Sequence, residues 1–198
     1  MVSADVGGDE VTMRYKTILV DPPWPERGGG KVKRGADRHY PLLSLAEILA
    51  LPVGRLVHPE GCHLYLWTTN RFFGDALLIL AWWGFEYRTT ITWAKQGNIG
   101  LGQYFRGKTE HCLFGVRGRL PYRTREDGKR SQGKTLILAP KRGHSEKPEE
   151  LRSMAEVVSH GPRVELFARR RVRGWDAWGD EIESTPHVAA TMNKETEP

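Results

Sequence analysis

Short apolar runs with the composition of β-strands alternate along this chain with segments in which apolar residues have helical spacing. Strands are predicted at residues 16–20, 63–68, 87–93, 111–116, 136–138 and 164–167, and helices at residues 44–51, 72–83 and 148–158. This alternation predicts an α/β sandwich with a mostly parallel sheet. Such sheets bind ligands beyond the carboxyl ends of their strands, where Asp21, Thr68 and Phe167 are placed.

The length of the chain, 198 residues, fits a single domain. We expect a flexible leader over residues 1–13, the folded domain over residues 14–183 and a disordered polar tail over residues 184–198. The sequence has neither an apolar leader with a cleavage site nor an uncharged run long enough to span a membrane, which predicts a cytoplasmic protein.

The two cysteines, Cys62 and Cys112, lack the paired spacing of a zinc site. We therefore expect two buried thiols, no disulfide scaffold and no metal.

The chain carries 30 Lys and Arg against 24 Asp and Glu, which gives a formal net charge of +6. This excess is typical of a protein whose partner carries phosphates, such as a nucleic acid. Solvated arginine faces produce the same balance, so charge alone leaves both interpretations open.

Asp21-Pro22-Pro23-Trp24 follows the first predicted strand and has a chemical use if the substrate is an aromatic amine. The lone pair of the adenine N6 amine is delocalised into the ring, so the amine needs acceptors that engage its hydrogens. The Asp21 carboxylate and the Pro22 carbonyl can be those acceptors, while Trp24 offers a face to a flipped-out base. A rigid turn in which Trp24 folds back onto the core explains the same four residues.

Further motifs resemble those of the DPPW-type adenine-N6 methyltransferases, the MT-A70-like family, which includes the catalytic subunit of the eukaryotic messenger-RNA methyltransferase. The resemblance extends from about Tyr15 to Ile182, and its motifs besides Asp21–Trp24 are His39-Tyr-Pro41, Leu64-Tyr-Leu-Trp67, Trp93-Ala-Lys95, Thr109-Glu-His-Cys-Leu-Phe114, His144-Ser-Glu-Lys-Pro148, Glu165-Leu-Phe-Ala-Arg169, Gly174-Trp175 and Trp178-Gly179. It implies a Rossmann-like class I methyltransferase fold that uses S-adenosylmethionine, with the catalytic motif ahead of the cofactor strand. This permuted order fits the absence of a G-x-G-x-x-G loop.

The resemblance also implies a cofactor site. Lys147 would pair with the methionine carboxylate of S-adenosylmethionine, and Glu165 and Arg169 would lie around its ribose. A surface lysine and a charged edge-strand residue are the ordinary alternatives for Lys147 and Glu165. The remaining implied contacts come from Asp21, Ser145, Phe167, Gly179, Asp180 and Glu181. Many relatives have Gly-Asn where this chain has Gly179-Asp180, and an acid accepts hydrogen bonds without donating them.

A substrate-binding lid is expected before the first helix. Tyr40 resembles the aromatic residue of a gate loop that closes over the base, although it could equally anchor the following helix. The residues that suit phosphate contacts, or a solvated surface, are Lys31, Lys33, Arg34 and Arg38. His39, next to Tyr40, is a further candidate for substrate binding.

The segment Gly128–Thr135 satisfies the phosphate-loop pattern G-x-x-x-x-G-K-T. That loop binds phosphate only between a buried strand and a helix, whereas here a polar segment precedes it and a strand follows. We therefore reject an NTPase and predict that Lys129, Arg130 and Lys134 contact nucleic acid.

We expect methyl transfer to the N6 amine of adenine in DNA, without a metal or a covalent enzyme intermediate. The compact chain resembles family members that act on DNA, but no residue identifies itself as a reader of the RNA 2′-hydroxyl. RNA is therefore the first alternative. The second is a catalytically silent partner that binds nucleic acid, and either protein is compatible with a homodimer.

Overall fold

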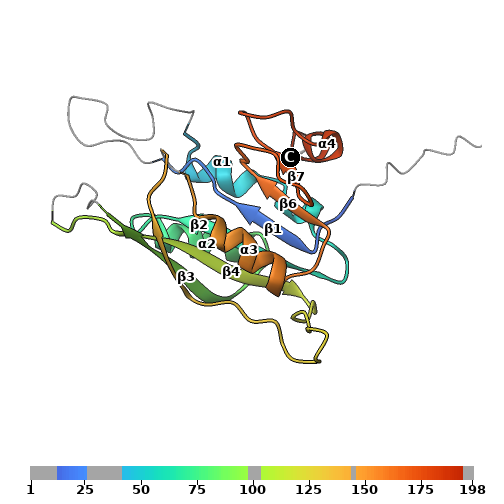
Figure 1. The fold of residues 1–198 in the computed structure, drawn as a ribbon. Coiled ribbons are helices and arrows are strands. Elements are labelled where there is room, and N and C mark those ends of the chain that lie inside the picture. Colours follow the sequence, from blue (N-terminus) through green and yellow to red (C-terminus); the bar gives the residue numbers. More distant parts are fainter. Residues whose placement is uncertain (1–12, 26–41, 98–103, 144–145, 194–198) are drawn as a thin grey trace, which may run out of the picture.

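The sheet of this protein has seven strands in the order β5-β3-β4-β2-β1-β6-β7 (Figure 1). A computed structural model describes residues 13–25, 42–97, 104–143 and 146–193. The strands are β1 (Thr17–Val20), β2 (Gly61–Thr68), β3 (Glu86–Gln96), β4 (Thr109–Gly118), β5 (Leu136–Pro140), β6 (Arg163–Leu166) and β7 (Asp176–Trp178). Neighbouring strands pair in parallel except around β4, which is antiparallel to both β2 and β3. The prediction of an α/β fold with a mostly parallel sheet is therefore confirmed.

Strand β1 lies inside the sheet, between β2 and β6, and all four of its residues are buried. Its last residue, Val20, pairs with Leu66 of β2 on one side and with Leu166 of β6 on the other. The chain thus proceeds from β1 toward one edge of the sheet and later returns to the other side of β1. Open α/β sheets bind ligands at such a reversal, and Asp21 is the first residue beyond it.

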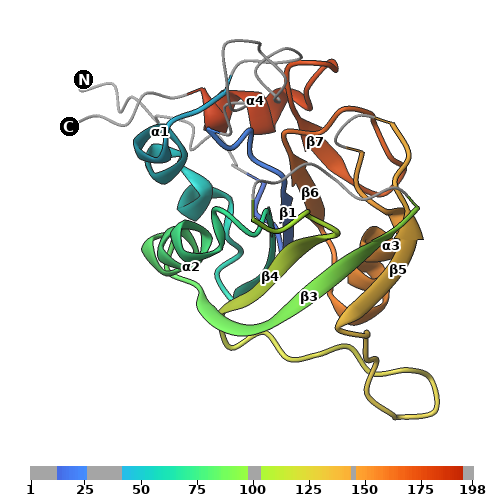
Figure 2. The same ribbon diagram turned by 90° about the vertical axis from the view of Figure 1, so that its left-hand side faces the viewer.

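Helices cover both faces of the sheet (Figure 2). One face packs against α1 (Leu45–Ala50), the 3-10 helix η2 (Val53–Leu56), α2 (Phe73–Trp82) and α4 (Pro186–Met192). The other face packs against α3 (Glu149–Val158), whose Leu151 and Ala155 are buried. Burial of these two apolar faces holds the sandwich together.

The predicted capping box at the start of α1 is confirmed. The Glu47 backbone N–H donates to Ser44 Oγ over 3.2 Å, and the Ser44 N–H donates to Glu47 Oε2 over 2.7 Å. Pro148 is the N-cap of α3 instead of its first helical residue. Both cysteines are buried free thiols, as expected.

The predicted disordered tail over residues 184–198 is wrong for α4. Val188 and Met192 have helical spacing and are buried in the core. Tyr15 also joins the helix to the sheet, because its hydroxyl lies 2.7 Å from both His187 Nε2 and Asp176 Oδ2. Strand β7 was missed as well, since its three residues are too few to show a pattern. The expected leader lies almost wholly outside the described residues, and none of the described helices is long and apolar enough to cross a membrane.

Candidate active site

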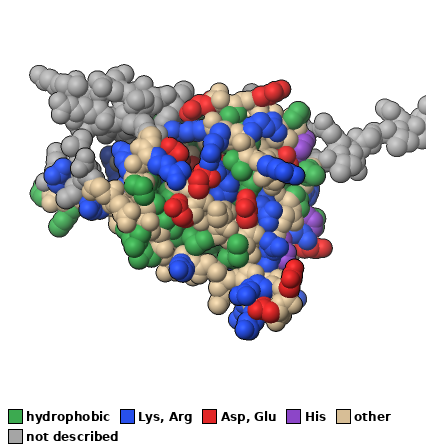
Figure 3. Space-filling model, viewed as in Figure 1, with side chains coloured by type: hydrophobic (Ala, Val, Ile, Leu, Met, Phe, Trp, Pro, Cys, Tyr) green, Lys and Arg blue, Asp and Glu red, His purple; other side chains and the backbone are tan. Residues whose placement is uncertain are grey.

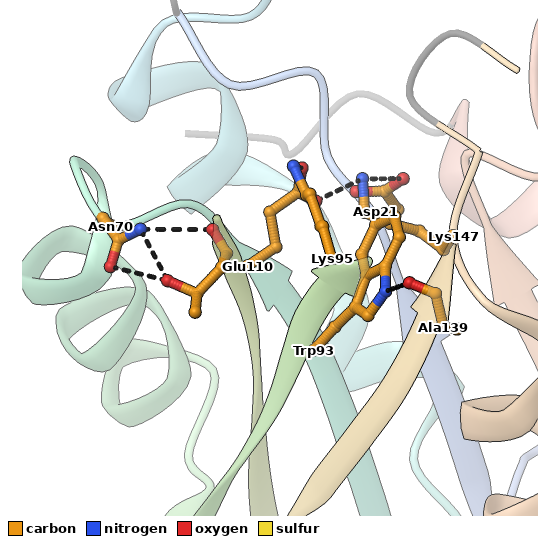
Figure 4. Close-up of polar contacts among 8 residues, drawn as sticks. Asp21, Asn70, Trp93, Lys95, Glu110, Ala139 and Lys147 are labelled. Carbon is orange, nitrogen blue, oxygen red and sulfur yellow. Dashed lines mark hydrogen bonds and ion pairs between the residues drawn. The ribbon is translucent and has the colours of Figure 1, made fainter. Parts of the chain in front are cut away.

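A chain of ion pairs connects Asp21 to two other strands at the carboxyl edge of the sheet (Figure 4). Lys147 Nζ lies 3.0 Å from Asp21 Oδ2 and 3.3 Å from Glu110 Oε2. Glu110, at the start of β4, also pairs with Lys95 near the end of β3. Their side chains are 15–21% exposed, so the network is shielded from most of the solvent. Two carboxylates and two lysines therefore alternate beside the end of β1.

Burial sets the charges of this network. It raises the pKa of Asp21 above its ordinary value, and the positive charge of Lys147 offsets only part of that rise. Burial also acts to raise the pKa of Glu110, but Lys147 and Lys95 outweigh it and hold this pKa below the ordinary value. For Lys147, burial disfavours the charged form, yet the two carboxylates prevail and raise its pKa. Lys147 is thus a permanent cation between two acids.

A cavity of about 280 Å³ opens beside Asp21, near the lower end of the range for small-molecule sites. Five residues predicted to contact the cofactor line it, namely Asp21, Lys147, Glu165, Phe167 and Arg169. Trp67 supplies an apolar wall, and its ring lies 5.7 Å from Lys147 Nζ. On the face of the molecule that α3 covers, acidic and basic side chains are intermixed (Figure 3). The cavity thus offers both charge signs and an aromatic surface.

Glu165 does not lie on an edge strand, because β6 lies between β1 and β7. Its Oε2 accepts a hydrogen bond of 2.6 Å from Nη2 of Arg152 on α3. Burial raises the pKa of Glu165, and Arg152 offsets part of this rise. Glu165 is therefore a partly buried acid in the cavity wall with an arginine partner.

A second cavity, of about 60 Å³, also borders Asp21 and includes Asp180 and Glu181. Asp21, Phe167 and Arg169 line both cavities. Phe167 directly follows β6 and has a φ of 60°, which is strained for a residue with a bulky side chain. The predicted cofactor residues are therefore divided between two cavities that share Asp21.

Gly179, which the resemblance also places at the cofactor, has a steric role in the structure. A Cβ atom at this position would lie 2.2 Å from the backbone oxygen of Ala168. The close approach of the segments that follow β6 and β7 thus requires glycine here, next to the cavity residue Asp180.

The expectation that Trp24 offers a face to a flipped-out base is wrong. Its side chain is only 6% exposed and stacks on Phe72, with ring centroids 5.4 Å apart. Its indole N–H donates to the Trp67 backbone oxygen over 3.0 Å. The Trp24 backbone N–H donates to the Pro22 carbonyl over 2.8 Å, which occupies one of the two lone pairs of that oxygen. The tetrapeptide is therefore a rigid turn anchored by Trp24, and it presents Asp21.

Lys129, Arg130 and Lys134 are not brought to the site. Strand β4 runs antiparallel, so its last residue, Gly118, pairs with Gly61 at the start of β2. The following loop therefore lies at the amino edge of the sheet, opposite Asp21 (Figure 1). In that loop the Arg130 guanidinium lies over the ring of Tyr122, and strand β5 follows, as expected when the phosphate-loop interpretation was rejected.

Some predicted site residues lie outside the described residues, namely Lys31, Lys33, Arg34, His39, Tyr40 and Ser145. Sequence reasoning assigned no role to Glu110, Lys95 or Arg152. The first two stand in motifs that carried the resemblance, and a charged residue at the end of an apolar strand was a usable signal. Arg152 gave no such signal, because it lies on a helix among other charged residues.

Exposed aromatic side chains lie near the same edge of the sheet. Tyr104 and Phe105 are each 92% exposed, and they precede Arg106 and Lys108, which are also exposed. The backbone oxygen of Lys108 accepts a hydrogen bond from the Lys95 N–H, so this segment leads directly into the ion-pair network. Aromatic and cationic side chains thus flank the site.

Comparison with known proteins identifies the family. Residues 15–181 match the MT-A70 family. The type II methyltransferase M.MunI of Mycoplasma sp is 30% identical over 191 residues, covering 85% of this chain and 78% of that protein. The N6-methyladenosine RNA methyltransferase MTA1 of Cryphonectria parasitica is 32% identical, covering 85% and 52%, and the human N(6)-adenine-specific methyltransferase METTL4 is 29% identical, covering 88% and 39%. The chain thus spans about half or less of the length of MTA1 and METTL4. On the match to residues 15–181, the chain belongs to the MT-A70 family of adenine N6-methyltransferases.

Proposed function

We propose that this chain transfers a methyl group from S-adenosylmethionine to the N6 amine of adenine in DNA. The observation that carries the proposal is the position of Asp21. It directly follows β1 at the reversal of the sheet, pairs with Lys147 and forms a wall of both cavities. Its carboxylate therefore lies where a methyl donor bound in these cavities and an acceptor amine can meet.

The residues of the two cavities fit the cofactor that MT-A70 methyltransferases use. S-adenosylmethionine has a carboxylate, an ammonium and a sulfonium group, and a ribose with two hydroxyls. Lys147 would hold the carboxylate, and Glu165 would accept hydrogen bonds from the ribose hydroxyls. Asp180 and Glu181, in the smaller cavity, add acceptors only. When bound, the cofactor supplies an electrophilic methyl group.

Within this proposal, Asp21 prepares the amine for attack. Its ionised carboxylate accepts a hydrogen bond from N6, which localises the nitrogen lone pair, and it favours loss of the proton after transfer. The Pro22 carbonyl can still accept through its second lone pair. Lys147 favours the ionised form of Asp21, which burial alone would disfavour. The rigid turn at Pro22-Pro23 holds the acceptor in position, so little reorganisation is needed.

DNA as the polymer is supported by M.MunI, a type II methyltransferase whose length this chain covers by 78%. The net charge of +6 and the exposed Tyr104 and Phe105 favour a nucleic-acid polymer over a free nucleoside. RNA is the competing substrate, because MTA1 is a similar protein and is an RNA methyltransferase.

The test incubates the protein with S-adenosylmethionine and either duplex DNA or RNA, digests the polymer and measures N6-methylated nucleosides by mass spectrometry. We expect product from DNA, and a loss of roughly 100-fold or more in rate for Asp21→Asn, with cofactor binding retained in calorimetry. Product from RNA alone would overturn the choice of polymer. Cofactor binding without product from either polymer would indicate the silent partner, whereas full activity of Asp21→Asn would refute the role of Asp21.

A further inference from the structure

Arg152 connects helix α3 to the wall of the larger cavity. Its Nη2 donates to Glu165 Oε2 and its Nη1 to Glu149 Oε2, both over 2.6 Å. The side chains of Arg152 and Glu165 are only 11% and 15% exposed. We propose that Arg152 is a positioning residue that orients Glu165 toward the ribose hydroxyls of the cofactor. This inference rests on the proposed function, because it concerns the same cofactor.

The geometry explains why Glu165 needs a partner. Glutamate has three rotatable side-chain bonds, and its carboxylate can turn in a cavity of about 280 Å³. The bond from Arg152 engages Oε2 only, since the second arm of the guanidinium goes to Glu149. Arg152 therefore fixes one carboxylate oxygen against α3 and leaves Oε1 for a hydroxyl group in the cavity. A fixed acceptor loses less side-chain entropy when the ligand binds.

The charge of Arg152 supports the same role. Burial raises the pKa of Glu165, and the negative charges of Asp21 and Glu149 raise it further. Arg152 is the cation that opposes this rise, so it favours the ionised carboxylate of Glu165, which can accept a hydroxyl proton. An uncharged residue at position 152 would leave a buried acid among other acids.

Arg152 is itself held in place. Glu149 lies three residues earlier on α3 and bonds to Nη1, and the same Glu149 pairs with Arg170. The order Arg170–Glu149–Arg152–Glu165 thus alternates in charge from the cavity rim to β6. Because each member has a charged neighbour, the guanidinium is fixed before the cofactor arrives.

The test compares Arg152→Met with the wild type in calorimetric binding of two ligands, S-adenosylhomocysteine and its 2′,3′-dideoxy analogue. We expect the substitution to weaken the binding of S-adenosylhomocysteine by roughly tenfold or more, since the charge-assisted hydrogen bond between Glu165 and the ribose depends on Arg152. The affinity for the dideoxy analogue should change by less than about twofold. Arg125→Met is the matched control, because Arg125 is also ion-paired, with Asp127, but lies in the loop at the opposite edge of the sheet.

A purely structural role of Arg152 would weaken both ligands equally, and that result would overturn the inference while leaving the proposed function intact. If Arg152→Met bound each ligand as tightly as the wild type does, the inference would also be overturned. If Arg152→Met does not fold, Glu165→Gln provides the second variant. The side chain of this variant can still accept a hydrogen bond from Arg152, and the variant should show the same loss of discrimination between the two ligands. Retained discrimination would contradict the inference. If the wild type binds neither ligand, the proposed function itself fails.

Discussion

Lys147 Nζ lies 3.0 Å from Asp21 Oδ2, so a lysine just before α3 neutralises the carboxylate that directly follows β1. The same Nζ lies 3.3 Å from Glu110 Oε2. One cation therefore pairs with two partly buried acids, and the charge state of Asp21 depends on both Lys147 and Glu110.

The rate of methyl transfer should fall on the acid side at a pH above the ordinary carboxyl value of about 3.9. Burial raises the pKa of Asp21, and only the ionised carboxylate accepts a hydrogen bond from the amine. As the pH falls through this raised pKa, Asp21 takes up a proton and activity is lost. The measurement is kcat as a function of pH. Glu165→Gln is the control, because burial also raises the pKa of Glu165, and an acid limb that disappears in this variant would assign the titration to Glu165.

Glu110→Gln should move this acid limb to lower pH. The negative charge of Glu110 raises the pKa of Asp21, so its removal favours the ionised form of Asp21. Lys147 then no longer shares its charge between two carboxylates. Lys147→Met should move the limb in the opposite direction, because burial of Asp21 is then no longer offset. Profiles of kcat against pH for the two variants check these opposite shifts. Shifts in the same direction would show that the network does not control the pKa of Asp21.

Trp24→Ala should destabilise the fold by about 3–5 kcal/mol, because a buried ring that stacks on Phe72 is removed. Trp24→Phe keeps an aromatic ring and loses the hydrogen bond to the Trp67 oxygen, which costs about 1 kcal/mol. Urea unfolding measures both changes. We expect Trp24→Phe to keep the wild-type KM for the polymer. A stable Trp24→Phe protein with a strongly raised KM would instead support the hypothesis that the base stacks on Trp24.

Replacement of both Tyr104 and Phe105 by Ala should raise the KM for the polymer by roughly tenfold or more, because a stacked base contributes about 1–3 kcal/mol. Binding of S-adenosylhomocysteine should not change, since neither residue lines the cavities. Trp82→Ala is the matched control, because Trp82 is 71% exposed on α2. If gel filtration instead shows that the double variant loses a wild-type dimer, these residues belong to a protein interface.

Much of the fold was predictable because periodicity is a local property of the sequence. The apolar runs located β1 and β2, and the spacing around Ala76 and Leu80 located α2. The capping residues Ser44 and Glu47 located the start of α1. Helix α4 was missed because it is only seven residues long and lies in an otherwise polar segment, and only packing shows that Val188 and Met192 are buried.

The sequence by itself determined that Asp21 follows a buried strand, that prolines stiffen the turn after it and, through the order of its motifs, the family to which the chain belongs. Only the tertiary structure decided that Trp24 turns into the core, that Glu110 and Arg152 join the site, and that Lys129 lies at the opposite edge. These facts depend on strand order and on the direction of β4. Local spacing does not encode either, because contacts between distant segments form only when the sheet is assembled.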